Sequence, residues 1–171
     1  MTKKIVTLLA LFLLITGCDK NDESFNKDEK NYKSKIQILA NTPTKNSTKN
    51  SKENPVAAKI IAEFDVAVAD KKDTMERGLM NVDFLAERHG MLFLFSHSRI
   101  INMWMKDTKI ALDMIFIDEN DRIVTIKTNA QPYSSNIISS YKMANKVLEI
   151  NAKEVAKHHI QIGQKINFIR N

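Results

Sequence analysis

Cysteine and glycine are both scarce in this chain of 171 residues. Cys18 is the single cysteine, so no internal disulfide can form. The chain has only four glycines, and none of them builds a glycine-rich phosphate loop. No serine occupies a G-x-S-x-G turn, the usual sign of a hydrolase nucleophile in that setting. The sequence therefore carries no standard nucleophile motif and no standard phosphate-binding motif.

Histidine and methionine give little support for a metal site. His158 and His159 are neighbours on a predicted short helix, so their side chains diverge, and His89 and His97 fall in predicted loops without spaced carboxylates. Seven of the eight methionines follow residue 57, and thioethers bind Cu(I) in oxidising compartments. Adaptable core filling explains them better, because no M-x-x-M run occurs. We predict no metal and no cofactor, with copper binding as the alternative.

Positive charge is spread unevenly along the chain, which has a net charge of +6. Residues 19–57 hold eight lysines against six acidic residues, whereas residues 58–171 hold sixteen Lys and Arg against fourteen Asp and Glu. Nucleic-acid binding requires a basic face on the folded domain itself. The net charge of this part of the chain is close to zero, so we predict no nucleic-acid partner.

A short leader opens the chain. Lys3 and Lys4 precede an apolar run at residues 5–15, which is shorter than the about 20 residues of a membrane-spanning helix and suits a signal peptide. The sequence I-T-G-C at residues 15–18 resembles the lipobox of bacterial lipoproteins. This resemblance implies that residues 1–17 are removed and that Cys18 carries lipid such as palmitate. An ordinary secretory signal or an uncleaved anchor is the alternative.

The leader predicts a location in the bacterial cell envelope. Lipid on Cys18 would hold the protein to the membrane, on its periplasmic or outer face. Asp19 resembles the residue that retains enteric lipoproteins in the inner membrane, which favours that membrane. Residues 18–56 are predicted to form a disordered tether, because they are rich in Lys, Asn, Ser and Asp and poor in large apolar residues. The one apolar patch, at residues 36–40, is too short to change this prediction.

Residues 57–171 are predicted to form a single α+β domain that is mainly β, a small barrel or sandwich with one or two short helices. Apolar and alternating runs predict strands at residues 58–70, 91–95, 100–107, 112–118, 122–130, 146–152 and 164–170. Helical patterns occur at residues 70–81 and 152–159. A polar break at residues 96–99 and a polar loop at residues 131–142 separate neighbouring strands.

Several motifs in a fixed order resemble the family called DUF192. They are GLM at residues 78–80, GMLFLF at 90–95, MWMKDT at 103–108, LDMIFID at 112–118, QP at 131–132 and VLEINA at 147–152. The resemblance implies a compact β-rich fold and brings no established activity. The family usually has Gly where this chain has Lys153, and commonly Asp where it has Gln164, so a site at those positions would be altered here.

One group of side chains is the candidate site. A carboxylate among apolar neighbours is costly to bury without a partner, so Asp113 and Glu149 should each meet a cation, and Arg77 and Lys106 are the natural donors. Period-two alternation places Met103 and Met105 on the face opposite Trp104. The candidate ligand-binding residues are Arg77, Trp104, Lys106, Asp107, Asp113 and Glu149.

Three functions are consistent with this group. An exposed aromatic ring with paired charges favours a binding or accessory module for a sugar or another small polar solute. A glycan hydrolase of the envelope would instead use Asp113 and Glu149 as paired carboxylates for acid and base chemistry. A salt-bridge network that only supports the fold is the third possibility. The sequence favours a non-enzymatic protein and assigns no catalytic residue.

Overall fold

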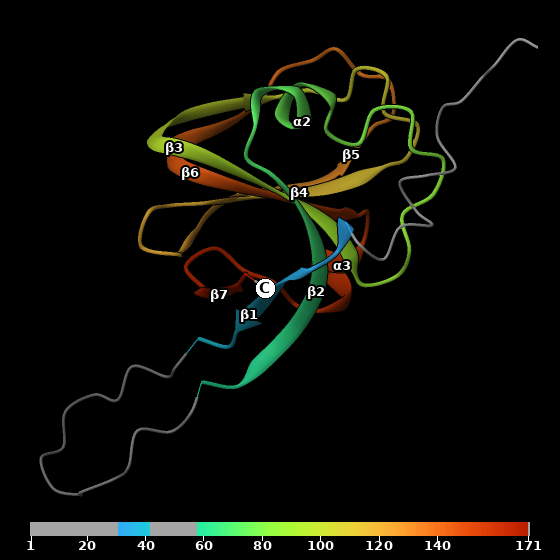
Figure 1. Ribbon diagram of the computed structural model, residues 1–171. Helices are drawn as coiled ribbons and strands as arrows, with labels where there is room; N and C mark the ends of the chain where they lie inside the picture. The colour runs from blue at the N-terminus through green and yellow to red at the C-terminus, as the bar shows by residue number, and fades with distance from the viewer. Residues whose placement is uncertain (1–30, 42–57, 171) are drawn as a thin grey trace, which may run out of the picture.

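A computed structural model describes residues 31–41 and 58–170 (Figure 1). These residues form seven strands and two short helices, which confirms the predicted mainly-β α+β domain. The predicted leader, Cys18, Asp19 and most of the predicted tether lie outside the described residues. The elements are β1 Ser34–Leu39, β2 Ile60–Ala69, α2 Lys72–Arg77, β3 His89–Met103, β4 Leu112–Ile117, β5 Ile123–Ala130, β6 Ile138–Asn151, α3 Glu154–Lys157 and β7 Ile166–Ile169.

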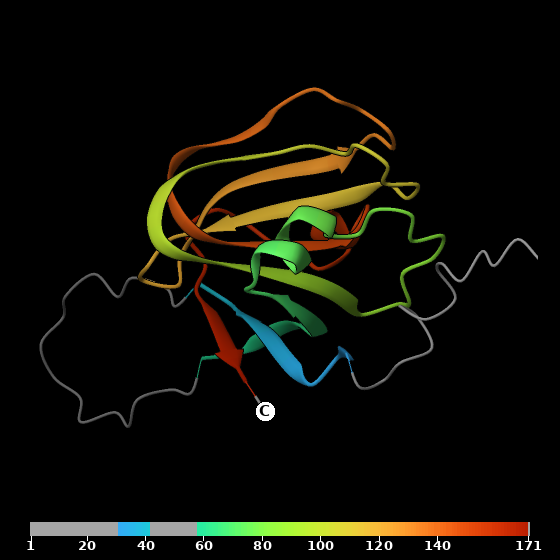
Figure 2. The same ribbon diagram turned by 45° about the horizontal axis from the view of Figure 1, so that its top comes forward.

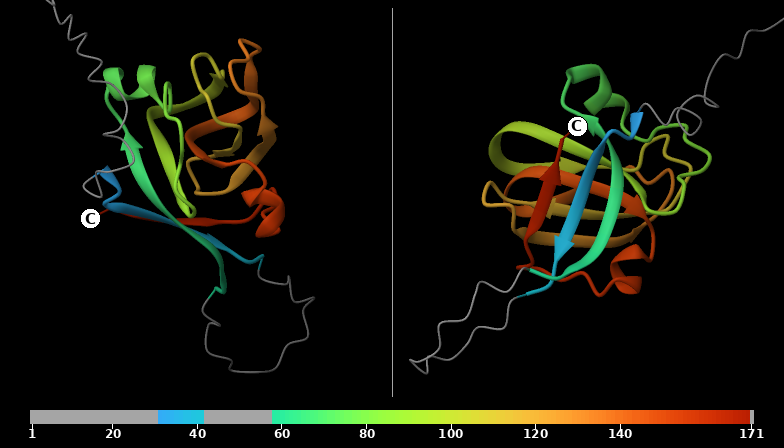
Figure 3. Two further views of the ribbon diagram at one scale, coloured as in Figure 1. Left: turned by 90° about the vertical axis from the view of Figure 1, so that its right-hand side faces the viewer. Right: turned by 60° about the horizontal axis from the view of Figure 1, so that its bottom comes forward.

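All seven strands belong to one strongly curled sheet with the order β5-β4-β6-β3-β2-β1-β7. The β2–β3 pair is parallel, and the other neighbours are antiparallel. The edge strands are β5 and β7. The residues just before these two strands meet at an isolated β-bridge between Arg122 and Lys165. Figure 3 shows β2, β1 and β7 side by side and the rest of the sheet bending around them. The sheet therefore forms an incomplete barrel.

Side-chain alternation divides the apolar core into two clusters, one on each face of the sheet. Strand β4 is buried at every position; Met114 and Phe116 join one cluster, and Ile115 and Ile117 join the other. Helix α2 lies on the first face and α3 on the second (Figure 1). Neither described helix has the length and apolar character needed to cross a bilayer.

Strand β1 corrects the predicted tether. Residues 34–39 pair with β2 on one side and with β7 on the other, so they lie inside the sheet. Ile36 and Ile38 are fully buried in the core. A six-residue run cannot fold alone, but it can complete a sheet whose two neighbouring strands are supplied by distant parts of the chain. The prediction was wrong for this segment.

Strands β3 and β6 are longer than predicted, because their outer halves pair with each other across the expected polar break and polar loop. These halves bend over one face of the sheet in Figure 2. Their inner halves approach so closely that a Cβ on Gly90 would lie 2.7 Å from the carbonyl oxygen of Glu149. The glycine of the GMLFLF motif is therefore a packing requirement of this strand pair.

Candidate functional site

A cleft opens between α2 and the outer half of β3. It consists of two adjoining hollows of about 30 Å³ and about 260 Å³. Residues of α2, β3 and the segment after β3 line both hollows, and we call the combined space the α2–β3 cleft. The shared lining residues are Met75, Glu76, Phe93, Met103 and Trp104.

The two walls of the cleft are held together by the turn that follows α2. Gly78 has a φ of +50°, and a Cβ there would come within 3.1 Å of the Phe93 ring, so a side chain would strain the backbone and crowd the ring. Next to this turn, Asn81 N donates a hydrogen bond of 2.7 Å to the carbonyl oxygen of Asp107. The backbone of Asp107 also has a left-handed conformation, with a φ of +55°. The GLM and MWMKDT motifs thus build the two sides of one cleft.

Glu149, from β6, lines the smaller hollow and is only 4% exposed. Within the described residues, its carboxyl group makes no hydrogen bond and no salt bridge, so the predicted partnership with Arg77 or Lys106 was wrong. Burial raises the pKa of Glu149 to about 8, because a charged carboxylate is poorly solvated there. At neutral pH the group is mainly the neutral acid, which can both donate and accept a hydrogen bond.

Aromatic and cationic groups line the same cleft as this acid. Trp104 is 49% exposed and lines both hollows, while the alternating Met105 is buried in the core, as the sequence predicted. Arg77 and Lys106 are exposed and line the smaller hollow. Four of the six predicted side chains therefore meet in one cleft.

Asp113 lies elsewhere and has a structural role. Its carboxylate is fully buried and accepts backbone N–H bonds of 2.8 Å from Asn129 and 2.9 Å from Val155. These bonds join β4 to the end of β5 and to the first turn of α3, where backbone donors lack helical partners. The predicted cationic partner was wrong because two backbone amides already satisfy the carboxylate.

The positions of Asp113 and Glu149 in the sheet contradict a mechanism in which they act as paired carboxylates. Asp113 is opposite Ile150, and Glu149 is opposite Met114, so the two acids occupy adjacent positions on paired strands. Ile150 belongs to one core cluster and Met114 to the other, which places the two carboxylates on opposite faces. No substrate can lie between them, and Asp107, whose side chain lies outside the cleft lining, does not replace either one.

The comparisons with known proteins agree with this fold. The family model DUF192, described as "Uncharacterized ACR", matches residues 53–168. The chain belongs to the DUF192 family. No curated protein matches it.

Two solved structures resemble this DUF192 domain. A Sinorhizobium meliloti 1021 protein, proposed to be a transcription regulator, is 30% identical with a TM-score of 0.67, over 79% of this chain and 92% of that one. A protein of unknown function from Novosphingobium aromaticivorans DSM 12444 is 25% identical with a TM-score of 0.64, over 78% and 83%.

The two positions where the sequence departs from the DUF192 pattern lie outside the cleft. Lys153 has a φ of +79° at the start of α3, a backbone conformation that suits glycine. Gln164 is buried and accepts a 2.9 Å hydrogen bond from the Gln161 backbone. Both departures affect the framework of the domain, and the lining of the α2–β3 cleft is unaffected.

Several cleft residues carry no signal of their own in the sequence. Met75, Met80 and Met103 match the pattern of core residues, and only the docking of α2 onto β3 shows that they form walls. Thr108 is buried beside the acid, and its hydroxyl donates to the carbonyl oxygen of Lys106 at 3.3 Å. The order of the family motifs was the one available hint that these segments meet.

Proposed function

We propose that the α2–β3 cleft binds a small polar ligand of the sugar type and that the protein is a binding or accessory module. One observation supports this most: a buried carboxyl without a protein partner among the described residues lies in the same cleft as a half-exposed indole. Buried polar groups are normally hydrogen-bonded, so Glu149 leaves a position for a ligand hydroxyl. Trp104 offers an apolar face on which a sugar ring can lie.

The charges around the cleft favour an acidic member of this class. Arg77 and Lys106 line the smaller hollow, whereas Glu149 is mainly neutral near pH 7. Glu76 is the remaining acid of the lining, and Lys72 lies 3.9 Å from its carboxylate. An arginine fork binds a carboxylate well, so a uronic acid should bind more tightly than the matching neutral sugar.

Calorimetric titration with glucuronic acid and glucose tests this proposal. We expect binding of glucuronic acid, weaker binding of glucose, and a loss of about tenfold or more in affinity in Trp104→Ala and in Glu149→Gln. Tyr133→Ala is the matched control for the exposed aromatic residue, because Tyr133 is exposed and lies outside the cleft lining. Glu154→Gln is the control for the buried acid, because Glu154 already contacts Lys157 and His158. Equal affinities in the wild type and in both cleft variants would refute the proposal.

A role in DNA binding has less support in this chain. The Sinorhizobium meliloti protein is proposed to regulate transcription, but affinity for DNA comes largely from clustered Lys and Arg. Beyond residue 57 this chain carries sixteen basic against fourteen acidic residues. We therefore propose no DNA-binding role.

We further propose that lipid on Cys18 holds this module at the outer side of a bacterial membrane. The I-T-G-C sequence after an apolar run supports this location. Cells grown with labelled palmitate should incorporate label into the wild-type protein and not into Cys18→Ser. An unlabelled wild-type protein would exclude the lipid anchor and leave the cleft proposal intact.

A further inference from the structure

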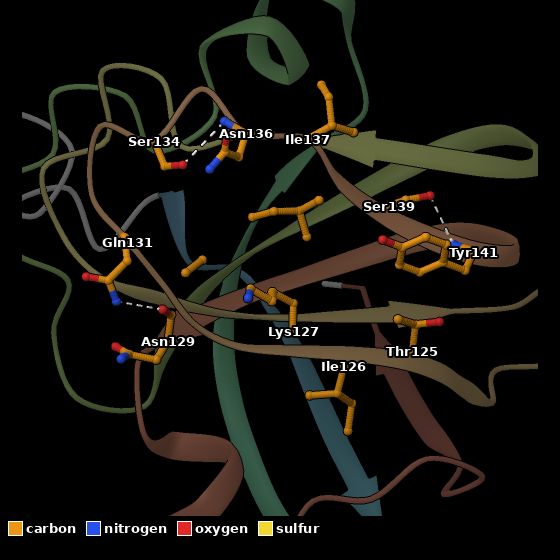
Figure 4. A pocket seen from close by; sticks show the side chains of 12 residues that line it. Thr125, Ile126, Lys127, Asn129, Gln131, Ser134, Asn136, Ile137, Ser139 and Tyr141 are labelled. Atoms are coloured by element: carbon orange, nitrogen blue, oxygen red, sulfur yellow. Dashed lines mark hydrogen bonds between the residues drawn. The ribbon is translucent and has the colours of Figure 1, made fainter.

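A second cleft lies between β5 and the part of the chain that leads into and begins β6. Strand β5 is an edge strand, and the segment from residue 131 to the start of β6 runs opposite it without forming a ladder among the described strands. The Thr125 hydroxyl donates across this gap to the carbonyl oxygen of Ser140. The cavity has a volume of about 290 Å³, and we call it the β5–β6 seam (Figure 4).

The lining of the seam combines apolar side chains with neutral polar ones. Lys127 is its only charged side chain, while amides and hydroxyls come from Asn129, Gln131, Asn136, Thr125, Ser134 and Ser139. Within the described residues, the side-chain amides of Asn129 and Asn136 and the ammonium group of Lys127 make no hydrogen bond. These groups can therefore pair with a ligand without breaking protein contacts.

An exposed aromatic ring borders the same cavity. Tyr141 is 79% exposed, and its backbone N–H donates to the Ser139 hydroxyl at 3.1 Å (Figure 4). Tyr141 and Asn129 are both left-handed, with φ values of +53° and +51°. This conformation is strained for a tyrosine, whereas asparagine adopts it more readily. Backbone strain of this kind collects at ligand-binding positions.

We propose that the β5–β6 seam binds one ring of an N-acetylated sugar. Side-chain amides can donate to and accept from an acetamido group at once. The tyrosine ring supplies an apolar surface for the sugar face, and hydroxyls complete the lining. A cavity of about 290 Å³ lies at the lower end of the range for small-molecule sites, which suits a single ring.

The seam is separate from the α2–β3 cleft. No residue lines both sites. They approach each other at the β3–β6 ladder, where Ile138 of the seam pairs with Met103 of the cleft. The lining charges differ as well, because the seam contains no acid and the cleft contains two. Variants of one site should therefore leave the other intact.

Nuclear magnetic resonance titration of the ¹⁵N-labelled protein with N-acetylglucosamine tests the proposal. We expect backbone shifts concentrated at residues 125–141 and smaller shifts with glucose, which lacks the acetamido group. Tyr141→Ala and Asn136→Ala should each weaken binding about tenfold. Trp104→Ala should leave the affinity that is read from the shifts of the seam residues unchanged, because Trp104 does not line the seam. This readout separates the proposal from that for the other cleft.

Tyr133→Ala is the matched control. Tyr133 is also exposed and left-handed, with a φ of +59°, but it does not line the seam. Its variant should bind as the wild type does. The proposal is overturned if shifts occur only in the α2–β3 cleft, if no shifts occur, or if Tyr141→Ala and Tyr133→Ala bind alike.

Discussion

Asp113 and Glu149 lie at adjacent positions across the β4–β6 ladder and face opposite sides of the sheet. Two backbone amides satisfy the first carboxylate, whereas the second reaches a cleft without a protein partner among the described residues. Their roles therefore differ although both are buried acids: Asp113 supports the fold, and Glu149 is available to a ligand.

Asp113→Ala should lower the free energy of unfolding by about 2–4 kcal/mol, because it leaves the backbone N–H groups of Asn129 and Val155 without their acceptor. Urea denaturation measures this loss. Asp118→Ala is the control: Asp118 also accepts two backbone N–H bonds, but in an exposed turn where water can replace it. Equal losses in the two variants would show that burial of Asp113 contributes nothing.

Stability should fall with rising pH because of Glu149. Its pKa is raised from 4.5 to about 8, so the folded state binds the proton more tightly than the unfolded state does. This contribution is fully present below about pH 4.5 and is lost as the pH rises through about 8. A tenfold change in proton affinity corresponds to about 1.4 kcal/mol, so the loss is on the order of 3–5 kcal/mol.

Glu149→Gln removes the ionisation and keeps the shape of the side chain. The stability difference between wild type and variant, measured by chemical denaturation from about pH 4 to about pH 9, should shift in favour of the variant as the pH rises. A difference that is independent of pH would contradict the burial of an unpartnered carboxyl.

Ile36→Ala tests whether β1 belongs to the folded domain. Ile36 is fully buried between β2 and β7, and loss of such a side chain costs about 2–5 kcal/mol. Gln37→Ala, on the other face of the same strand, should cost less than about 1 kcal/mol. Thermal unfolding compares the two, and an unchanged midpoint in Ile36→Ala would place the start of the domain after β1.

Lys153→Gly should stabilise the protein by about 0.5–1 kcal/mol, since glycine adopts the φ of +79° without a steric penalty. Lys142→Gly, at an exposed β6 position without a positive φ, should be neutral or destabilising. Calorimetric melting distinguishes them. A lower melting temperature in Lys153→Gly would mean that the lysine side chain stabilises the start of α3.

The sequence predicts those parts of the fold that depend on local pattern. The continuous apolar run of β4 correctly predicts that strand and its burial. The alternation around Trp104 correctly predicts that Ile101 and Met105 are buried, but the predicted strand was wrong beyond Met103, where β3 ends. Strand β1 could not be predicted in this way, because its stability comes from two distant neighbours. The outer halves of β3 and β6 also could not be predicted from local pattern. They contain many polar residues, and their strand structure depends on their pairing with each other.

The site was predictable only in part. Charges in apolar surroundings correctly identified Asp113 and Glu149 as buried acids. Their partners could not be inferred, because backbone amides have no sequence signature and the sheet face of each acid depends on strand register. The β5–β6 seam was not predicted, since its amides and hydroxyls resemble an ordinary polar loop.

The fluorescence of Trp104 as a function of pH tests whether Glu149 is an unpartnered buried acid of the α2–β3 cleft. Trp104 is the only tryptophan in the chain, so the indole emission reports on the cleft alone. Ionisation of Glu149 beside it should change the emission with a midpoint near pH 8, and Glu149→Gln should show no such transition. Absence of a transition between about pH 6 and about pH 9 in the wild type, or the same transition in the variant, would show that Glu149 does not titrate in this cleft.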